Sequence, residues 1–340
     1  MALFFISIMK SYKLSIVVPV YNRPDELLAL LNTLVDQTRA VDEVVVVEDG
    51  SSEDSSSVVA RFTDQLPLVY LTKPNTGPGD SRNYGMRHAT GDYFIILDSD
   101  CELPSGYIAA IHDSLALNPV DFFGGPDAAA DEFSDLQKAI SFSMTSVLTT
   151  GGIRGGSQKK FEPRSFNMGL SRKAFESSGG FGLIHPGEDP DLSIRLRQMG
   201  FVSALFQTVF VYHKRRITWA SFYKQVYRFG SARPILMRRY PGTFRLAYAL
   251  PSLFLIGTLC ALLFALVGWY LPIGLLLFYF LSVLLVSAIQ HKSGLIALKS
   301  LQAVMVQLYG YGWGFARSYV KLFNTRKTPE ELLPELFFRK

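Results

Sequence analysis

The stretch Tyr93-Phe94-Ile95-Ile96-Leu97-Asp98-Ser99-Asp100 decides how this chain folds. Its first five residues are apolar and lie between turn-forming residues, which predicts a buried strand. The carboxylates of Asp98 and Asp100 follow that strand, at the edge where open α/β sheets bind ligands. Hard oxygen ligands at such an edge suit Mg²⁺ or Mn²⁺, which commonly complete their coordination shells with substrate phosphates. An isolated Asp-Ser-Asp is more often a solvated turn, so the surrounding sequence must distinguish the two.

Three further apolar runs precede this strand and alternate with helical patterns. The expected elements are a strand at 15–20, a helix from Pro24, strands at 44–47 and 68–71, and a helix near 81–88. Strands and helices in alternation, joined by short loops, predict an α/β fold whose mostly parallel sheet carries helices on both faces. Parallel strands end at a common edge, so we expect Asp49, the 77–82 loop and Asp98 to share one rim.

Charge is distributed unevenly along the chain. Residues 1–240 carry 25 basic and 26 acidic side chains, whereas residues 241–340 carry 9 and 3. The formal net charge of +5 therefore belongs to the C-terminal third. No nucleic-acid-binding motif accompanies this excess, so it predicts contact with an anionic membrane surface and not with nucleic acid.

The segment from Leu246 to Gln290 contains no charged residue. It divides at Trp269-Tyr270-Leu271-Pro272 into the runs 246–268 and 273–290. Each run is close to the ~20 residues that cross a bilayer as a helix. Aromatic residues and proline at the divide are typical of a turn at the membrane interface. The alternative is a buried hairpin of a soluble protein, which two adjacent uncharged runs of this length disfavour.

Basic residues on both flanks predict the orientation of this hairpin. Arg238, Arg239 and Arg245 precede the first run, and Lys292 and Lys299 follow the second. Cytosolic loops carry the excess of Lys and Arg in membrane proteins. The sequence therefore predicts a multi-pass protein of the cell inner membrane or plasma membrane, with a cytosolic catalytic domain.

Two further segments suggest contact with lipid headgroups. Aromatic and basic residues interleave at 217–243, which predicts a pair of amphipathic surface helices, lying either in the headgroups or against the catalytic domain. The apolar segment 300–316 contains the glycine-rich run Tyr309-Gly310-Tyr311-Gly312-Trp313-Gly314. A third crossing there would place the following basic residues outside the cell, against the charge rule, so we expect an interfacial or re-entrant segment.

Five short motifs carry a resemblance to a known family. They are VVPVYN at 17–22, VEDGSS at 47–52, NTGPGDSRNYG at 75–85, DSD at 98–100 and GEDPDLSIRL at 187–196. Each motif is weak alone, but the ordered series is similar to the family-2 inverting glycosyltransferases of GT-A fold. The resemblance covers roughly residues 13–230. It implies a Rossmann-like GT-A catalytic domain, a nucleotide-sugar donor and a Mg²⁺ or Mn²⁺ ion.

The resemblance implies a donor site at the ends of the first strands. In that family the acid at the position of Asp49 recognises the nucleobase, and a carboxylate can accept an N–H of uracil or guanine. The alternative role of Asp49 is to cap the turn that follows it. Pro19, Tyr21 and Asn22 would line the base and ribose pocket. Arg82 follows a glycine-rich loop at a helix start, where guanidinium and helix N-terminus both favour a diphosphate.

The same resemblance implies a metal site at the Asp-Ser-Asp motif, the DXD motif of the family. Asp98 would hold the ribose or a metal-bound water, and Asp100 the metal that bridges the diphosphate. Such an ion neutralises charge on the departing nucleoside diphosphate. Some GT-A enzymes use a third ligand at the position of His213, although a lone His is more often structural. The adjacent Lys214-Arg215-Arg216 could hold a phosphate.

Glu188-Asp189 is the second acidic pair of the sequence. An inverting transfer needs a general base that takes the proton of the acceptor hydroxyl during in-line attack. The family has this catalytic base at the Asp of the pair, here Asp189, with Glu188 and Asp191 next in line. The alternative role is to cap the helix expected at 192–199, which fits Asp191 better.

Two motifs suggest further contacts with substrate. FNMG at 166–169 and GGF at 179–181 resemble the acceptor side of the family's site, so Asn167, Gly180 and Phe181 are expected acceptor residues. Asn167 could equally make a turn. QVYRF at 225–229 is similar to the Gln-x-x-Arg-Trp motif of processive synthases, with Phe in place of Trp, which weakens a prediction of processivity. Its Arg228 is a further candidate for binding the diphosphate.

The sequence thus predicts a membrane-anchored, inverting, metal-dependent glycosyltransferase that acts on a lipid-linked or polysaccharide acceptor at the cytosolic face. A close variant uses polyprenyl phosphate itself as the acceptor. A nucleotidylyltransferase, which would have no use for Glu188-Asp189, and a non-catalytic membrane scaffold are the alternatives. The expected parts are an N-terminal extension at 1–12, a catalytic domain at 13–216, interfacial helices at 217–243, a membrane region at 244–323 and a cytosolic tail at 324–340.

Overall fold

The computed structural model describes residues 12–128, 134–149, 161–213 and 218–338. Most of the expected N-terminal extension and the triplet Lys214-Arg215-Arg216 lie outside the described residues. The strands are β1 Leu14–Val20, β2 Glu43–Asp49, β3 Leu68–Lys73, β4 Tyr93–Leu97, β5 Cys101–Glu102, β6 Phe122–Gly124, β7 Asp127–Ala128, β8 Asn167–Ser171, β9 Ser203–Leu205 and β10 Val211–His213. The helices are α1 Pro24–Val35, α2 Ser56–Ala60, α3 Pro78–His88, α4 Tyr107–Leu117, α5 Asp135–Thr145, α6 Arg172–Ser178, α7 Glu188–Gln198, α8 Trp219–Arg239, α9 Leu246–Leu266, α10 Leu271–His291, α11 Gly294–Leu322, α12 Pro329–Leu332 and the short 3-10 helix Pro334–Leu336.

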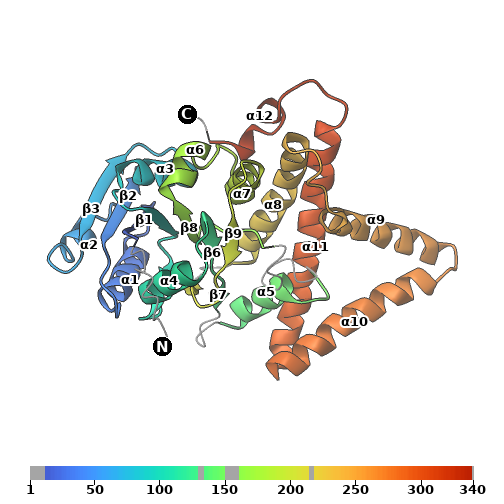
Figure 1. Ribbon diagram of the computed structural model, residues 1–340. Helices are drawn as coiled ribbons and strands as arrows, with labels where there is room; N and C mark the ends of the chain where they lie inside the picture. The colour runs from blue at the N-terminus through green and yellow to red at the C-terminus, as the bar shows by residue number, and fades with distance from the viewer. Residues whose placement is uncertain (1–11, 129–133, 150–160, 214–217, 339–340) are drawn as a thin grey trace, which may run out of the picture.

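A seven-stranded sheet forms the centre of the N-terminal domain, in the order β3-β2-β1-β4-β8-β6-β9. The strands β3, β2, β1 and β4 are parallel, as the sequence predicts, and β8 runs antiparallel to both of its neighbours. Helices lie on both faces of the sheet, which confirms the predicted α/β class (Figure 1). Because β1, β2 and β4 are parallel, the residues after them lie on a single rim.

Alternation along β1 divides the core into two layers. Ile16 and Val18 pack with apolar residues of α1 and α4, whereas Val17 packs with residues of α3 and α7 on the opposite face. Successive side chains of a strand point to opposite faces, and a parallel sheet buries both. The strand β4 is fully buried, so the turn that carries Asp98 and Asp100 extends from the rigid centre of the domain.

Within the predicted segment 217–243, residues Trp219–Arg239 form one long helix, α8, where we expected a pair of surface helices. Its buried face includes Phe222, Val226 and Ile235, and it packs along α11. This helix therefore joins the catalytic domain to the C-terminal helices, the second of the two roles that the sequence left open.

The glycine-rich run at 309–314 lies inside α11, which is a continuous helix without the chain reversal of a re-entrant segment. A Cβ atom on Gly314 would lie 2.2 Å from the backbone oxygen of Tyr227, and one on Gly230 would lie 2.2 Å from that of Tyr311. These glycines let α8 and α11 approach closely, which outweighs their cost of about 1 kcal/mol each in a helix.

The helices α9 and α10 form an apolar hairpin that projects away from the sheet (Figure 1). Both are long and apolar enough to cross a membrane, and most of their large side chains are exposed. Their bounds agree with the predicted runs 246–268 and 273–290 to within two residues at each end. Length and composition alone make them candidate spans.

Gly85 provides a test of how closely α3 must approach the sheet. A Cβ atom there would lie 2.6 Å from Cγ1 of Val17 and 2.9 Å from Cγ2 of Val47. We expect Gly85→Ala to lower the free energy of unfolding by about 1–3 kcal/mol, because the packed core cannot yield. Thermal unfolding of the purified protein measures this loss.

The matched control for this test is Gly294→Ala at the start of α11, where an added Cβ meets no atom within 4 Å. That variant should unfold at or slightly above the temperature of the original protein. Equal midpoints for the two variants would contradict tight packing of α3 on the sheet.

Candidate active site

The loops after β1 and β2 are joined at the rim of the sheet. Asn22 has a φ of 53°, and its side-chain oxygen accepts hydrogen bonds from the backbone N–H groups of Ser52 (2.8 Å) and Glu53 (3.2 Å). Tyr21 is 50% exposed beside this link, whereas Pro19 lies within β1. Of these three predicted donor residues, Tyr21 has a side chain available to a ligand, and Asn22 holds the rim together.

Asp49 fixes the loop that leads into α3. Its Oδ1 accepts hydrogen bonds from the Thr76 N–H (3.0 Å) and the Lys73 ammonium group, and its Oδ2 accepts one from the Gly77 N–H (3.0 Å). Asp49 is only 3% exposed. Both oxygens are therefore engaged by the protein, and recognition of a nucleobase by Asp49 stays a prediction. Glu48 makes the turn contact instead, with the Ser51 hydroxyl.

Arg82 lies between the donor side and the second acidic pair. Its Nη2 donates to Oδ1 of Asp98 (2.7 Å), and its Nη1 donates to Oε1 of Glu188 (3.4 Å). The side chain is 4% exposed, and its guanidinium lies 5.4 Å from the ring centre of Phe181. Its Nε is buried with no acceptor among the described residues. A single cation thus links three motifs that the sequence separates by about a hundred positions.

Asp98 and Asp100 offer oxygen ligands on one turn. Asp100 accepts a hydrogen bond from Nη1 of Arg23 (2.8 Å), and its side chain is 11% exposed, against 32% for Asp98. Within the described residues, no group of three or more His, Cys, Asp or Glu side chains is placed to hold a metal. The donor set still fits Mg²⁺ or Mn²⁺, because such ions are commonly held by one or two carboxylates together with substrate phosphates.

The predicted third ligand, His213, ends β10. Its backbone pairs with that of Cys101 in β5, directly after the turn that carries Asp98 and Asp100. The structure describes the position of this residue in the strand and not its side chain. Metal binding by His213 therefore stays a prediction.

Glu188 and Asp189 begin α7, four residues before the helix start that the sequence predicts. Glu188 is 5% exposed and accepts hydrogen bonds from Nδ1 of His185 (3.0 Å) and from the Gly187 N–H (2.9 Å). Asp189 differs from its neighbour, because its Oδ1 is buried without a hydrogen-bond partner among the described residues. Such an unpaired oxygen lacks the donor that an acceptor hydroxyl would supply.

The pKa values of the two carboxyl groups are shifted in opposite directions. Burial and the adjacent charge of Glu188 raise the pKa of Asp189 to about 6, against the opposing charges of Arg82 and Arg164. Burial also acts to raise the pKa of Glu188, but the contact with His185 and the charge of Arg82 outweigh it and lower that pKa. Glu188 is therefore the fixed anion of the pair, and Asp189 is the group poised to exchange a proton near neutral pH.

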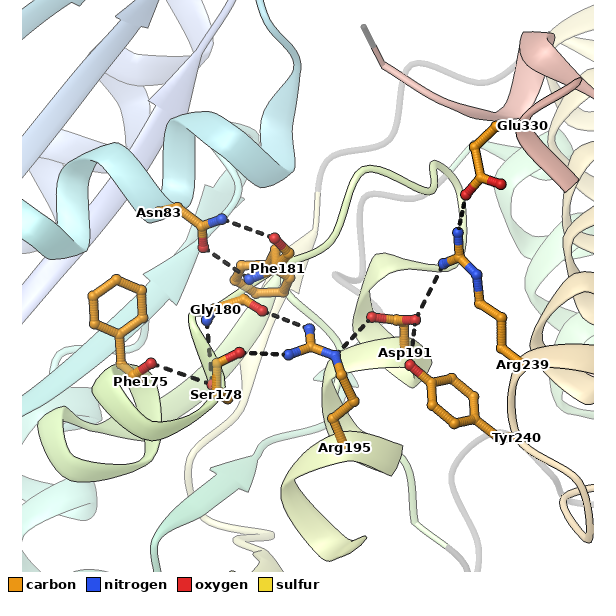
Figure 2. A network of polar contacts seen from close by, with 10 residues as sticks. All are labelled: Asn83, Phe175, Ser178, Gly180, Phe181, Asp191, Arg195, Arg239, Tyr240 and Glu330. Carbon is orange, nitrogen blue, oxygen red and sulfur yellow. Dashed lines mark hydrogen bonds and ion pairs between the residues drawn. The ribbon is translucent and has the colours of Figure 1, made fainter. Parts of the chain in front are cut away.

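Asp191 serves the structure of the domain. It accepts hydrogen bonds from Nε of Arg195 (3.0 Å) and the Tyr240 hydroxyl (2.8 Å), and Arg239 lies 3.4 Å away (Figure 2). The helix start has Gly187 as its N-cap, so the expectation that Asp191 caps it is wrong. The residue instead ties α7 to the end of α8.

The same network fixes the predicted acceptor positions Gly180 and Phe181. The amide of Asn83 pairs with both the N–H and the C=O of Phe181 (2.8 Å each), and Arg195 donates to the Gly180 oxygen (2.5 Å) (Figure 2). Phe181 is 6% exposed. These two residues are held rigidly beside Arg82, and their contact with an acceptor stays a prediction.

Two other predicted site residues are engaged within the protein. Asn167 is fully buried, accepts a hydrogen bond from the Tyr107 hydroxyl (2.7 Å) and donates to the Val209 oxygen (2.8 Å). Arg228 donates to the backbone oxygens of His185 (2.9 Å) and Glu335 (3.1 Å). The side-chain amide of Asn167 and Nη2 of Arg228 are thus engaged within the protein, and contact of either residue with a substrate stays a prediction.

The C-terminal segment 329–338, which we call the strap and which lies in the predicted tail 324–340, reaches the site. The N–H of His185 donates to the Leu336 oxygen (2.8 Å), and the N–H of Phe338 donates to the Leu183 oxygen (3.0 Å). Ile184 and Phe337 form an antiparallel bridge between these bonds. The strap is thus paired by backbone hydrogen bonds to the segment that precedes the acidic pair.

Phe338 extends the strap to the donor side. Its ring lies against Gly77, where an added Cβ would come within 2.5 Å of it, and 5.3 Å from the ring of His185. The N–H of Gly77 also donates a hydrogen bond to Asp49. The sequence signal for this contact was weak, consisting of several apolar residues in a short segment, Leu332, Leu333, Leu336, Phe337 and Phe338.

Comparison with known proteins gives a family for the N-terminal domain. Residues 15–179 match the sequence model of the family described as glycosyl transferase family 2. An uncharacterized glycosyltransferase of Haemophilus influenzae is 41% identical over 93 residues, which cover 27% of this chain and 31% of that protein. An undecaprenyl-phosphate 4-deoxy-4-formamido-L-arabinose transferase of Sodalis glossinidius is 36% identical over 102 residues, 28% of this chain and 31% of that protein. The matches span less than half the length of the curated relatives, from 14% to 46%.

A solved structure supports the fold over most of the chain. A mannosyltransferase of Pyrobaculum calidifontis, in complex with GDP-Man and Mn²⁺, superposes with a TM-score of 0.58. The superposition covers 92% of this chain and 88% of that one, at 17% identity. At this identity the likeness concerns the fold, which is the GT-A fold that the sequence predicts.

The strap can be tested by removing the ring of Phe338. We expect Phe338→Ala to lower the free energy that holds the strap against the domain by about 1–2 kcal/mol, because the ring packs against both Gly77 and His185. The backbone amide of His185, which donates to the Leu336 oxygen, should then exchange with deuterium about tenfold faster. Phe323→Ala is the control, because Phe323 is 68% exposed at the end of α11. Unchanged protection at His185 in Phe338→Ala would show that the ring does not hold the strap in place.

Proposed function

Because residues 15–179 form a glycosyl transferase family 2 domain, we propose that this protein is an inverting, metal-dependent glycosyltransferase with Asp189 as its general base. It would move a sugar from a nucleoside-diphosphate donor to a hydroxyl of a lipid-linked or polysaccharide acceptor. The observation that carries this proposal is the buried, unpaired carboxyl oxygen of Asp189, on a group whose pKa is raised to about 6.

The chemistry assigned to Asp189 is a proton transfer coupled to in-line attack. The acceptor oxygen forms a bond with the anomeric carbon while the bond from that carbon to the diphosphate oxygen breaks on the opposite face. The acceptor proton passes to Asp189, and the diphosphate leaves with the bonding electrons. One displacement of this kind inverts the configuration at the anomeric carbon.

Arg82 and the Asp-Ser-Asp turn supply the donor side of the proposed site. Asp98 and Asp100 would hold a Mg²⁺ or Mn²⁺ ion, whose chemistry is to neutralise charge on the departing diphosphate. Arg82, held by Asp98 and Glu188, contributes a fixed positive charge beside this turn. The bound GDP-Man and Mn²⁺ of the Pyrobaculum mannosyltransferase support this class of donor and ion.

The membrane location of the acceptor rests on the helices α9 and α10. Their basic flanks, Arg245 before α9 and Lys292 after α10, support a hairpin that returns to the cytosolic face. An enzyme anchored in this way in the inner or plasma membrane holds its site beside a lipid-linked acceptor and raises the effective concentration of that acceptor. Polyprenyl phosphate itself is the second candidate acceptor, because the name of the Sodalis relative includes undecaprenyl phosphate.

Asp189→Asn separates the catalytic role from a structural one. The amide keeps the size of the side chain but cannot take the proton, so sugar transfer should fall by about 10²–10⁴. Affinity for the nucleoside diphosphate and the unfolding temperature should stay near their original values. Radiolabelled sugar transfer, calorimetry and thermal unfolding measure the three quantities.

The matched control is Asp191→Asn, two residues along the same helix. Asp191 is paired with Arg195, Arg239 and Tyr240, so its neutralisation should lower the unfolding temperature while the remaining folded enzyme transfers sugar. Transfer by Asp189→Asn at close to the original rate would contradict the assignment and favour Glu188 as the base. Absence of transfer by the original protein would instead favour a non-catalytic scaffold.

The pH dependence of transfer follows from the raised pKa of Asp189. The fold raises this pKa above the ordinary value, so the protonated, inactive form accumulates as the pH falls through about 6. We expect kcat/KM, which reports the pKa of the free enzyme, to fall tenfold per pH unit below that point, because a protonated carboxyl cannot accept the acceptor proton. A rate profile between pH 4.5 and 8 measures this limb. A limb near the ordinary Asp pKa of about 4 would exclude Asp189 as the titrating base.

A further inference from the structure

A cavity lined by charged residues lies between α7, α8 and the start of α9, separate from the acidic pair Glu188 and Asp189. Its volume is about 380 Å³, and its lining includes Glu162, Arg197, Arg233, Phe244, Arg245 and Tyr248. None of these residues belongs to the proposed site for the donor or the base. The cavity adjoins the first residue of the apolar hairpin, because Arg245 is the N-cap of α9.

The cavity is positively charged. Burial acts to raise the pKa of Glu162, but the nearby Arg233, Arg164, Arg245 and Arg197 lower it, so this carboxylate is ionised. The lining therefore carries three guanidinium groups against one carboxylate. Glu162 lies 3.8 Å from Arg233, whose guanidinium in turn lies 4.1 Å from the ring centre of Tyr248.

The guanidinium groups of Arg197 and Arg245 form no ion pair with a carboxylate among the described residues. Arg197 donates to the Phe161 oxygen (2.6 Å), and burial together with the charge of Arg245 lowers its pKa. Among the described residues, no hydrogen bond or ion pair holds the guanidinium of Arg245. Two like charges that face one cavity repel each other, and a bound anion relieves this repulsion.

The surroundings of Arg245 indicate where such an anion comes from. Phe244 is 54% exposed and Leu246 is 61% exposed, so exposed apolar residues precede and follow Arg245 in the chain at the point where the hairpin begins. Arginine forms paired hydrogen bonds with phosphate oxygens, and basic pockets at the cytosolic ends of membrane helices bind lipid headgroups. A ligand with a phosphate group and an apolar body matches both features.

We propose that this cavity binds the phosphate group of an anionic membrane lipid, with Arg245 as the ligand-facing cation and Arg197 and Arg233 completing the cradle. The inference rests on the membrane hairpin of the proposed function. It is independent of the donor and of Asp189.

The test is a binding measurement on the full chain in a non-ionic detergent. Calorimetric titration with dioctanoyl phosphatidic acid, dioctanoyl phosphatidylcholine and inorganic phosphate compares a phosphomonoester lipid, a lipid without net charge and the free anion. We expect binding of phosphatidic acid that exceeds binding of the other two. Arg245→Gln should weaken it at least tenfold, because a charge-assisted contact is lost, while Arg245→Lys, which keeps the charge but not the paired hydrogen bonds, should weaken it less than Arg245→Gln does.

Lys292→Gln is the matched control, because it removes one positive charge at the other end of the same hairpin. General attraction to an anionic lipid predicts equal losses for Lys292→Gln and Arg245→Gln, at most about fivefold each. Equal losses, or no binding of phosphatidic acid, would overturn the proposal. Inorganic phosphate that binds as tightly as the lipid would make the cavity a site for free phosphate. The titration contains no sugar donor and measures binding alone. Its result therefore does not depend on whether the protein transfers sugar.

Discussion

The buried guanidinium of Arg82 is the interaction on which the active-site region depends. It is 4% exposed and is neutralised by Asp98 from the strand end and by Glu188 from α7. Removing one partner of such a buried pair typically costs about 3–5 kcal/mol, because the remaining charge stays desolvated. The donor rim and the acidic pair therefore cannot separate without exposing Arg82 to water. The neighbouring carboxyls differ because Glu188 is held by His185 and Arg82, which lower its pKa, whereas burial and the charge of Glu188 raise the pKa of Asp189.

A second constraint connects the catalytic domain to the apolar hairpin. The helix α11 packs against α8 on one side and against α9 and α10 on another. Its glycines bring backbones into contact, and the hydroxyls of Ser231 and Ser252 donate to the oxygens of Gly314 and Gly312. Contacts of this kind hold helices at a fixed distance. The orientation of the site relative to the hairpin is therefore set by backbone packing and not by a flexible linker.

The sequence predicted the four parallel strands and the rim that they share, because strand ends and carboxylate spacing are local features. It placed the start of α7 too late, at residue 192, although proline at 190 is tolerated in the first turn of a helix. The glycine run of α11 looked like a break because its partner, α8, lies about eighty residues away. Asn167 looked accessible for the same reason, since Tyr107 and Val209 engage it only after the chain has folded.

The strap also fixes an order of assembly. The segment that it pairs with ends before α7, yet the strap follows the hairpin in the chain. Domains made early in synthesis fold before later segments have left the ribosome. The hydrogen bond from the N–H of His185 to Leu336 therefore forms only after both helices of the hairpin have been made. The same holds for the contact between Phe338 and Gly77. A newly made catalytic domain thus lacks its contacts with the strap until the C-terminal helices have been made.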